Sequence, residues 1–155
     1  PQACESALKT LGEIKSKNAD DLSAQTGRKI AILGDMLELG RHTLSAHKNI
    51  GQIAKEILTE NSNENANALI VVGQRARAIK EGAIEAGMNI ENIFEFLDSY
   101  EAGNFIKTFA RKDDLILVKG SQSMRMERVV EAILSDKENK SKLLVRQEAE
   151  WLEKK

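Results

Sequence analysis

The chain has 155 residues, of which 41% are hydrophobic and 30% are charged, and its formal net charge is −1. These values are typical of one globular domain, and the balanced charge argues against nucleic-acid binding and against attachment to a membrane surface. One cysteine excludes an internal disulfide, and together with two histidines it is too little for a typical structural zinc site. No apolar run could span a bilayer and no signal peptide is visible, so we expect a cytoplasmic protein without membrane insertion. We also expect a monomer.

In chain order, the hydrophobic pattern predicts one helix and then four strand–helix units. Residues 5–17 carry apolar side chains at helical spacing, which predicts an amphipathic helix. Short apolar runs predict strands at residues 29–33, 68–72, 92–97 and 115–118, followed by helices at residues 44–58, 76–86, 98–111 and 124–134. Asp98 and Glu101 have the spacing of a capping box at the start of the third of these helices.

This order predicts an α/β fold of the Rossmann-like, doubly wound type. We expect a mainly parallel sheet of four or more strands with helices on both faces and right-handed crossovers. A first helix without a strand before it is unusual in this architecture, so the first strand is expected upstream of Pro1. The domain should comprise residues 1–136, and residues 137–155 should form a tail that packs on it.

The tail is polar at first and ends in an apolar stretch. A short strand at residues 143–145 followed by a helix is the favoured prediction, and one continuous helical face through Val145, Ala149 and Leu152 is the alternative. Trp151, the only tryptophan, is expected to pack the tail onto the body of the domain.

Polar residues follow all four predicted strands, and the carboxyl ends of parallel strands lie at one edge of a sheet. This rim should therefore gather Gly34 and Asp35, Gly73 to Arg75, Asp98 and Ser99, and the segment from Lys119 to Ser123. Cations, hydroxyl groups and a helix N-terminus can hold an anion, and the carboxylate of Asp35 could complement the ammonium group of a zwitterion. The sequence thus predicts an anion- or zwitterion-binding rim.

Several rim residues also have a purely structural explanation. Asp35 can cap its own turn, and Lys119 can be an ordinary solvated lysine. Arg125 and His47 can be surface residues of their helices. Arg75, in contrast, lies in the first turn of a helix, where a cation is unfavourable, and this placement indicates a nearby anion.

Other chemistries are not supported by the motifs. The chain lacks the glycine-rich phosphate loop, the dinucleotide-binding Gly-x-Gly-x-x-Gly pattern and the Gly-x-Ser-x-Gly nucleophile elbow. His42 and His47 are five residues apart and would lie on different faces of a helix, so no metal site is expected.

Two motifs together resemble the C-terminal domain of the Mur ligases. They are Leu-Gly-Asp-Met-Leu-Glu-Leu-Gly at residues 33–40, with His47 following, and Val-Lys-Gly-Ser-x-Ser-Met-Arg-Met-Glu at residues 118–127. The strand predicted at residues 69–73 also lies where the family has one, and Pro1 resembles the last residue of the motif that precedes this domain. The resemblance extends from Pro1 to about Asp136.

The resemblance implies one domain of a three-domain ligase of peptidoglycan synthesis, specifically the type that adds D-alanyl-D-alanine to UDP-MurNAc-tripeptide. ATP, Mg²⁺ and the UDP-MurNAc-tripeptide would bind mainly outside this chain. The chain itself would orient the dipeptide. It would contain no catalytic residue and would have no activity alone. For the dipeptide the resemblance favours Lys119 and Ser121 with Asp35 in support, and then Gly120, Ser123 and Arg125. Arg75, Gly34 and His47 are the candidate anion or nucleotide contacts.

Two other functions stay open at this point. The chain could be a stand-alone nucleotide- or phosphate-binding domain, although the missing phosphate loop argues against this. It could also be a non-catalytic interaction domain whose tail docks a partner.

Overall fold

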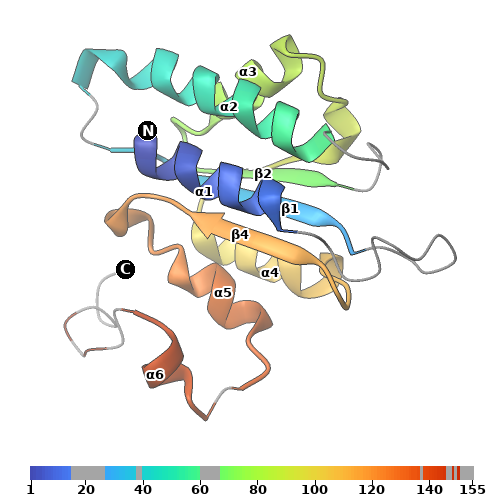
Figure 1. The fold of residues 1–155 in the computed structure, drawn as a ribbon. Coiled ribbons are helices and arrows are strands. Elements are labelled where there is room, and N and C mark those ends of the chain that lie inside the picture. Colours follow the sequence, from blue (N-terminus) through green and yellow to red (C-terminus); the bar gives the residue numbers. More distant parts are fainter. Residues whose placement is uncertain are drawn as a thin grey trace, which may run out of the picture.

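The computed structural model describes residues 1–14, 27–37, 40–59, 67–136, 138–145, 148 and 150. The centre of the fold is a sheet of four parallel strands in the order β3-β2-β1-β4 (Figure 1). The strands are β1 (Lys29–Gly34), β2 (Ala68–Val72), β3 (Ile93–Phe96) and β4 (Leu115–Lys119). The predicted parallel α/β fold is thereby confirmed, with each strand within about a residue of its predicted bounds.

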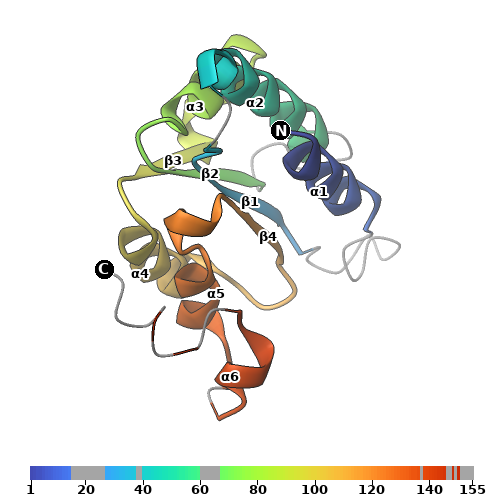
Figure 2. The ribbon, with the colours of Figure 1, turned by 90° about the vertical axis from the view of Figure 1, so that its left-hand side faces the viewer.

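Helices cover both faces of the sheet, so the fold is doubly wound (Figures 1 and 2). One face carries α1 (Gln2–Glu13), α2 (Thr43–Thr59) and α3 (Arg77–Glu85), and the other carries α4 (Ser99–Phe109) and α5 (Glu127–Ile133). The described residues also form the short 3-10 helices η1 (Gly40–His42), η2 (Ile90–Asn92) and η3 (Gln122–Met124), and α6 (Lys140–Leu143) follows α5. No helix in the described ranges is long and apolar enough to cross a membrane.

The central strands form the core because alternate side chains point to opposite faces. Leu33, Leu69 and Val71 pack toward α1, α2 and α3. Ile32 and Ile70 pack toward α4 and α5. Every residue of β2 is buried, which explains why these strands read as continuous apolar runs rather than as alternating patterns.

The capping box at the start of α4 is confirmed. The Asp98 carboxylate accepts the backbone N–H groups of Tyr100 and Glu101 at 2.8 and 2.9 Å. The Glu101 carboxylate reaches back in return, although it accepts the N–H of Leu97 at 3.0 Å rather than that of Asp98.

The chain path defines where a ligand site should lie. From β1 it proceeds through α2 to β2 and through α3 to β3, always on one face and in one direction. It then returns through α4 on the opposite face and adds β4 on the other side of β1. The strand order therefore reverses between β1 and β4, and open α/β sheets bind ligands outside the carboxyl ends of such a pair.

The strand predicted at residues 143–145 is wrong. Leu143 is the last residue of α6, and the sheet has only the four strands named above within the described residues. The Asp136 carboxylate caps the preceding turn by accepting the N–H of Asn139 at 3.1 Å, and Leu143 and Leu144 donate to the carbonyls of Asn139 and Lys140. This capped helical turn outweighs the strand tendency of a three-residue apolar run, while Trp151 lies outside the described residues.

Candidate functional site

The ends of β1 and β4 lie side by side, because Leu33 is paired with Lys119 in the sheet. The two following loops leave the sheet together and border a small cleft of about 170 Å³ with the first turn of α1. We call this the β1/β4 cleft, and it is lined by Pro1, Ala3, Cys4, Gly34, Met36, Leu37, Lys119, Gly120 and Ser121. Four of the predicted site residues, Gly34, Lys119, Gly120 and Ser121, therefore line this cleft at the point where the strand order reverses.

Two glycines allow the loops to approach this closely. A Cβ atom on Gly120 would lie 2.8 Å from Cγ of Met126 and 3.2 Å from Cα of Gly34. A Cβ atom on Gly34 would in turn lie 3.0 Å from the sulfur of Met126. The backbones therefore form one wall of the cleft over the Met126 side chain, and a side chain at Gly120 would separate them.

Asp35 is buried and turned toward β2 and α3. Its Oδ1 atom accepts the N–H of Ala76, directly before α3, at 2.7 Å, and its own N–H donates to the carbonyl of Val72 at 3.1 Å. Gly73 has a φ of +105°, and a Cβ there would lie 2.6 Å from the same Oδ1 atom. The carboxylate thus caps the start of α3 and joins the β1 loop, residues 35–37, to the β2 loop, residues 73–76.

Ser121 is tied to the β1 loop twice. Its N–H donates to the carbonyl of Asp35 at 3.0 Å, and its Oγ atom accepts the N–H of Leu37 at 2.7 Å. A hydroxyl group that accepts one hydrogen bond can still donate its proton to another group. Ser121 is therefore oriented as a hydrogen-bond donor that borders the cleft.

Lys119 supplies the charge of the cleft. Within the described part of the chain, its ammonium group forms neither an ion pair nor a hydrogen bond. Burial raises the pKa of the Cys4 thiol, and the nearby Lys119 charge acts in the opposite direction. A half-buried cation beside a donor hydroxyl is suited to a carboxylate or a phosphate group.

The interpretation of His47 as a surface residue is wrong, because its side chain is fully buried. Its Nε2 atom accepts the N–H of Met36 at 3.0 Å, and its Nδ1 atom lies 2.6 Å from the carbonyl oxygen of Thr43. Both ring nitrogens therefore bind backbone groups, and His47 holds the β1 loop rather than facing the cleft. No sequence pattern indicates this role, because the partner Met36 precedes the helix of His47 by several residues.

The remaining predicted residues lie elsewhere on the rim. The placement of Arg75 in the first turn of a helix is wrong, because Arg75 is exposed in the turn before α3, which begins at Arg77. Ser123 is exposed in η3. Arg125 is buried, and its side chain is ion-paired with Glu127. Its backbone has the left-handed conformation, with a φ of +51°. This left-handed residue ends η3, so α5 begins at Glu127 rather than at the predicted Met124.

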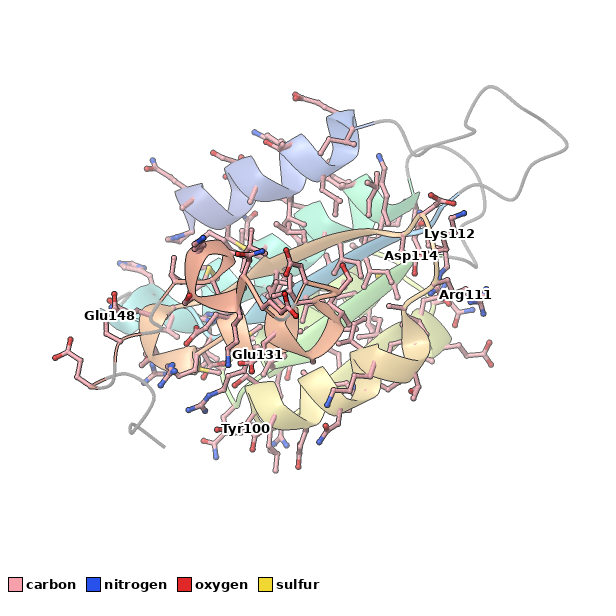
Figure 3. All side chains as sticks on the ribbon, turned by 90° about the horizontal axis from the view of Figure 1, so that it is seen from below. Tyr100, Arg111, Lys112, Asp114, Glu131 and Glu148 are labelled. Carbon is pink, nitrogen blue, oxygen red and sulfur yellow. The ribbon has the colours of Figure 1, made fainter. Side chains whose placement is uncertain are left out.

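Arg125 borders a second cavity instead of the β1/β4 cleft. This cavity of about 520 Å³ lies between α4 and α5, from which Tyr100 and Glu131 come (Figure 3). Its charged side chains are largely engaged: Arg128 stacks on the Tyr100 ring at 4.3 Å, and Lys140 is paired with Glu131. Nowhere in the described ranges do three His, Cys, Asp or Glu side chains gather as a metal-binding group.

Comparisons with known proteins identify the family that this chain resembles. Residues 1–122 match the family model of the Mur ligase, glutamate ligase domain. The UDP-N-acetylmuramoyl-tripeptide–D-alanyl-D-alanine ligase of Buchnera aphidicola subsp. Acyrthosiphon pisum is 33% identical over 121 residues, which cover 77% of this chain and 24% of that protein. The enzyme of the same name from Bacillus subtilis is 29% identical over 108 residues, which cover 70% of this chain and 22% of that protein.

Solved structures show the same relationship. MurF from Acinetobacter baumannii superposes with a TM-score of 0.59 and 25% identity, over 84% of this chain and 25% of that one. MurF from Thermotoga maritima, in complex with ADP, shares the fold with a TM-score of 0.56 at 22% identity, over 85% of this chain and 25% of that one. The chain spans about a quarter of the length of these relatives. By its sequence match and its fold, the chain belongs to the Mur ligase family.

Proposed function

We propose that the chain is the C-terminal domain of an ATP-dependent ligase that joins D-alanyl-D-alanine to UDP-MurNAc-tripeptide in peptidoglycan synthesis. The relatives from Bacillus subtilis and Buchnera aphidicola carry this activity in their names. The chain covers less than a quarter of the length of these two relatives, so its own contribution would be to present the dipeptide to the rest of the enzyme.

The observation that supports this contribution is that Lys119 and Ser121 both line the β1/β4 cleft. D-alanyl-D-alanine has one carboxylate, and an ammonium group without a partner among the described residues can bind it together with an oriented hydroxyl group by charge-assisted hydrogen bonds. A dipeptide fixed at its carboxylate presents its amino group in a restricted set of directions. Such positioning lowers the entropic part of the barrier to attack on an activated acyl group.

The other predicted site residues have supporting parts in this proposal. Gly34 and Gly120 shape the wall of the cleft, and Asp35 holds the loop that contacts Ser121. Arg75 and Ser123 are exposed on the same rim and would contact an anion, such as a nucleotide phosphate, that approaches from another domain. Arg125 would act indirectly, because its pairing with Glu127 fixes the turn after Ser123.

ATP and Mg²⁺ would be held mainly by the other domains of the enzyme. The described residues contain no cluster of acidic side chains that fits a metal ion, and the sequence has no phosphate loop. The cations of the rim could close over the nucleotide and exclude water when the domains come together. We therefore expect the isolated chain to catalyse no ligation.

Replacing Lys119 with alanine in the complete ligase tests the proposal. Loss of the ammonium group should raise KM for D-alanyl-D-alanine and lower kcat/KM by about 10- to 100-fold, because a charged hydrogen bond is lost. Steady-state kinetics with each substrate varied in turn measures this. Lys112→Ala, which removes an exposed lysine before β4, at the opposite end of the sheet, is the matched control and should change nothing. Unchanged dipeptide kinetics in Lys119→Ala would refute the proposed role.

The same experiment separates the two anions that the cleft could bind. If Lys119→Ala raises KM for ATP and leaves the dipeptide KM unchanged, Lys119 contacts a nucleotide phosphate instead. Calorimetric titration of the 155-residue chain with ATP adds a second test. Tight binding there would favour the alternative of a stand-alone nucleotide-binding domain.

A further inference from the structure

The β1 loop, residues 35–37, is held by a different element at each of its three residues. The N–H of Asp35 donates to the carbonyl of Val72 in β2, and the N–H of Met36 donates to Nε2 of His47 in α2. The N–H of Leu37 donates to Oγ of Ser121 in the β4 loop. Only the second of these bonds is made by a side chain that lies outside the cleft and the strand ends.

The two bonds of His47 determine which ring nitrogen carries the proton. A backbone N–H can only donate, so Nε2 must present its lone pair to Met36. A carbonyl oxygen can only accept, so Nδ1 must carry the proton that points to Thr43. The fully buried ring is thus fixed as the neutral Nδ1–H tautomer between the first turn of α2 and the β1 loop.

We propose that His47 is a positioning residue for the ligand of the β1/β4 cleft. By holding Met36, it fixes the adjacent N–H of Leu37 against Oγ of Ser121. Because that N–H occupies a lone pair of Oγ, the hydroxyl proton of Ser121 is turned away from Leu37 and is available to the ligand. His47 would therefore control the donor that faces a carboxylate or phosphate oxygen, without touching the ligand itself. This inference rests on the proposed function for the identity of the ligand.

The position of His47 makes the effect specific. If the acceptor atom Nε2 of His47 is removed, the N–H of Met36 is left buried without a partner. The free energy of the folded chain is then lowered when the loop moves to a position where that N–H finds another acceptor. The bonds of Asp35 to Val72 and Ala76 restrain the start of the loop, so the movement falls on its second half. That half contains Leu37, and the hydroxyl orientation of Ser121 would be lost with it.

Three variants of the complete ligase test this. His47→Met removes both polar ring atoms at similar volume and should raise KM for D-alanyl-D-alanine about tenfold, with KM for ATP within about twofold. His47→Gln retains an oxygen that can accept from Met36 and should return KM to within about threefold of the original value. Asn67→Ala is the matched control, because the Asn67 side chain also binds two backbone groups, of Lys29 and Leu58, but at the amino ends of the strands.

Two measurements on the chain itself need no substrate. The ¹⁵N spectrum of His47 should show a protonated Nδ1 and an unprotonated Nε2, with His42 as an internal reference. Amide hydrogen exchange in His47→Met should accelerate at Met36 and Leu37 and remain unchanged in β2. These results would support the positioning role even if the complete enzyme proved not to use the dipeptide, in which case only the proposed function fails.

Several outcomes would overturn the inference. An Nε2–H tautomer or an imidazolium ion at His47 would contradict the two hydrogen bonds. A His47→Met enzyme with unchanged dipeptide KM, or a His47→Gln enzyme without rescue, would contradict the coupling to Ser121. An equal rise in KM for Asn67→Ala would show that general loss of stability, rather than positioning, explains the kinetics.

Discussion

Replacing Gly82 with alanine is expected to destabilise the chain by about 3 kcal/mol, because the new methyl group collides with the backbone of a neighbouring helix. A Cβ atom at this position of α3 would lie 2.1 Å from the carbonyl oxygen of Lys48 and 2.7 Å from its carbonyl carbon, both in α2. Helix propensity alone predicts the opposite sign, since alanine is favoured over glycine by about 1 kcal/mol. Urea denaturation followed by circular dichroism measures the free energy of unfolding and shows whether the substitution destabilises the chain, as the collision predicts, or stabilises it, as helix propensity predicts.

The contact is reciprocal, so the collision cannot be relieved by a side-chain rotation. A Cβ atom on Gly51 of α2 would lie 2.0 Å from the carbonyl oxygen of Ile79 in α3. The two helices therefore cross backbone to backbone through this pair of glycines. Because α2 carries His47 and Asp35 caps the start of α3, a shift between these helices would also move the β1 loop.

Gly12→Ala is the matched control for this prediction. Gly12 is also helical, but its nearest neighbour would be the flexible end of the Ile57 side chain, with Cδ1 at 3.0 Å. The free energy of unfolding of the Gly12→Ala variant should differ from that of the original chain by no more than about 1 kcal/mol. Equal stability of the Gly82→Ala and Gly12→Ala variants would contradict the close backbone contact.

The fold could be predicted because its signals are local in the sequence. The runs at β1 and β2 are buried on both faces, and strands of this kind read as unbroken apolar segments. Alternation of strands and helices then leaves few topologies, and the carboxyl ends of parallel strands necessarily share one edge. The sequence therefore predicts that Lys119 and Ser121 lie on the same rim as the end of β1, whereas the direct pairing of β1 with β4 depends on the strand order.

The details of the site could not be predicted because they depend on contacts between distant residues. Asp35 and Ala76 are separated by 41 positions, and Leu37 and Ser121 by 84. No periodic pattern reports such pairs, so the structural part of Asp35 and the burial of His47 appear only in three dimensions. The left-handed turn at Arg125 was missed for a related reason, since a strong helical pattern surrounds it.

Replacing Asp114 with asparagine is expected to cost about 3–5 kcal/mol at pH 7, because it leaves the Arg28 guanidinium buried without its counter-ion. Asp114 lies in the turn before β4 (Figure 3), and the two side chains are only 2% and 8% exposed. Arg28 donates from two nitrogens, at 3.1 and 2.7 Å, and also stacks on the Phe109 ring at 4.5 Å. Thermal and urea unfolding at several pH values measure the cost.

The stability lost on replacing Asp114 with asparagine should become smaller as the pH falls. Burial by itself would raise the pKa of Asp114, but hydrogen bonds from Arg28 and from the N–H of Arg111, together with the Arg28 charge, lower it below its usual value. A carboxylate with a lowered folded pKa contributes its full stability above its unfolded pKa of about 4, and loses it as the pH falls through the folded value. The difference between the original chain and Asp114→Asn should therefore be constant near neutrality and shrink below about pH 4.

Glu95→Gln separates this buried pair from an ordinary surface pair. Glu95 is also ion-paired, with Arg77 and Lys80, and its pKa is also lowered, by the Lys80 hydrogen bond against a smaller effect of burial. Its partners remain accessible to water, so its loss should cost no more than about 1 kcal/mol and should diminish with salt. If Asp114→Asn were as mild as Glu95→Gln, the Arg28 charge would have found solvent, and the amino ends of the strands would be less tightly closed than their hydrogen bonds indicate.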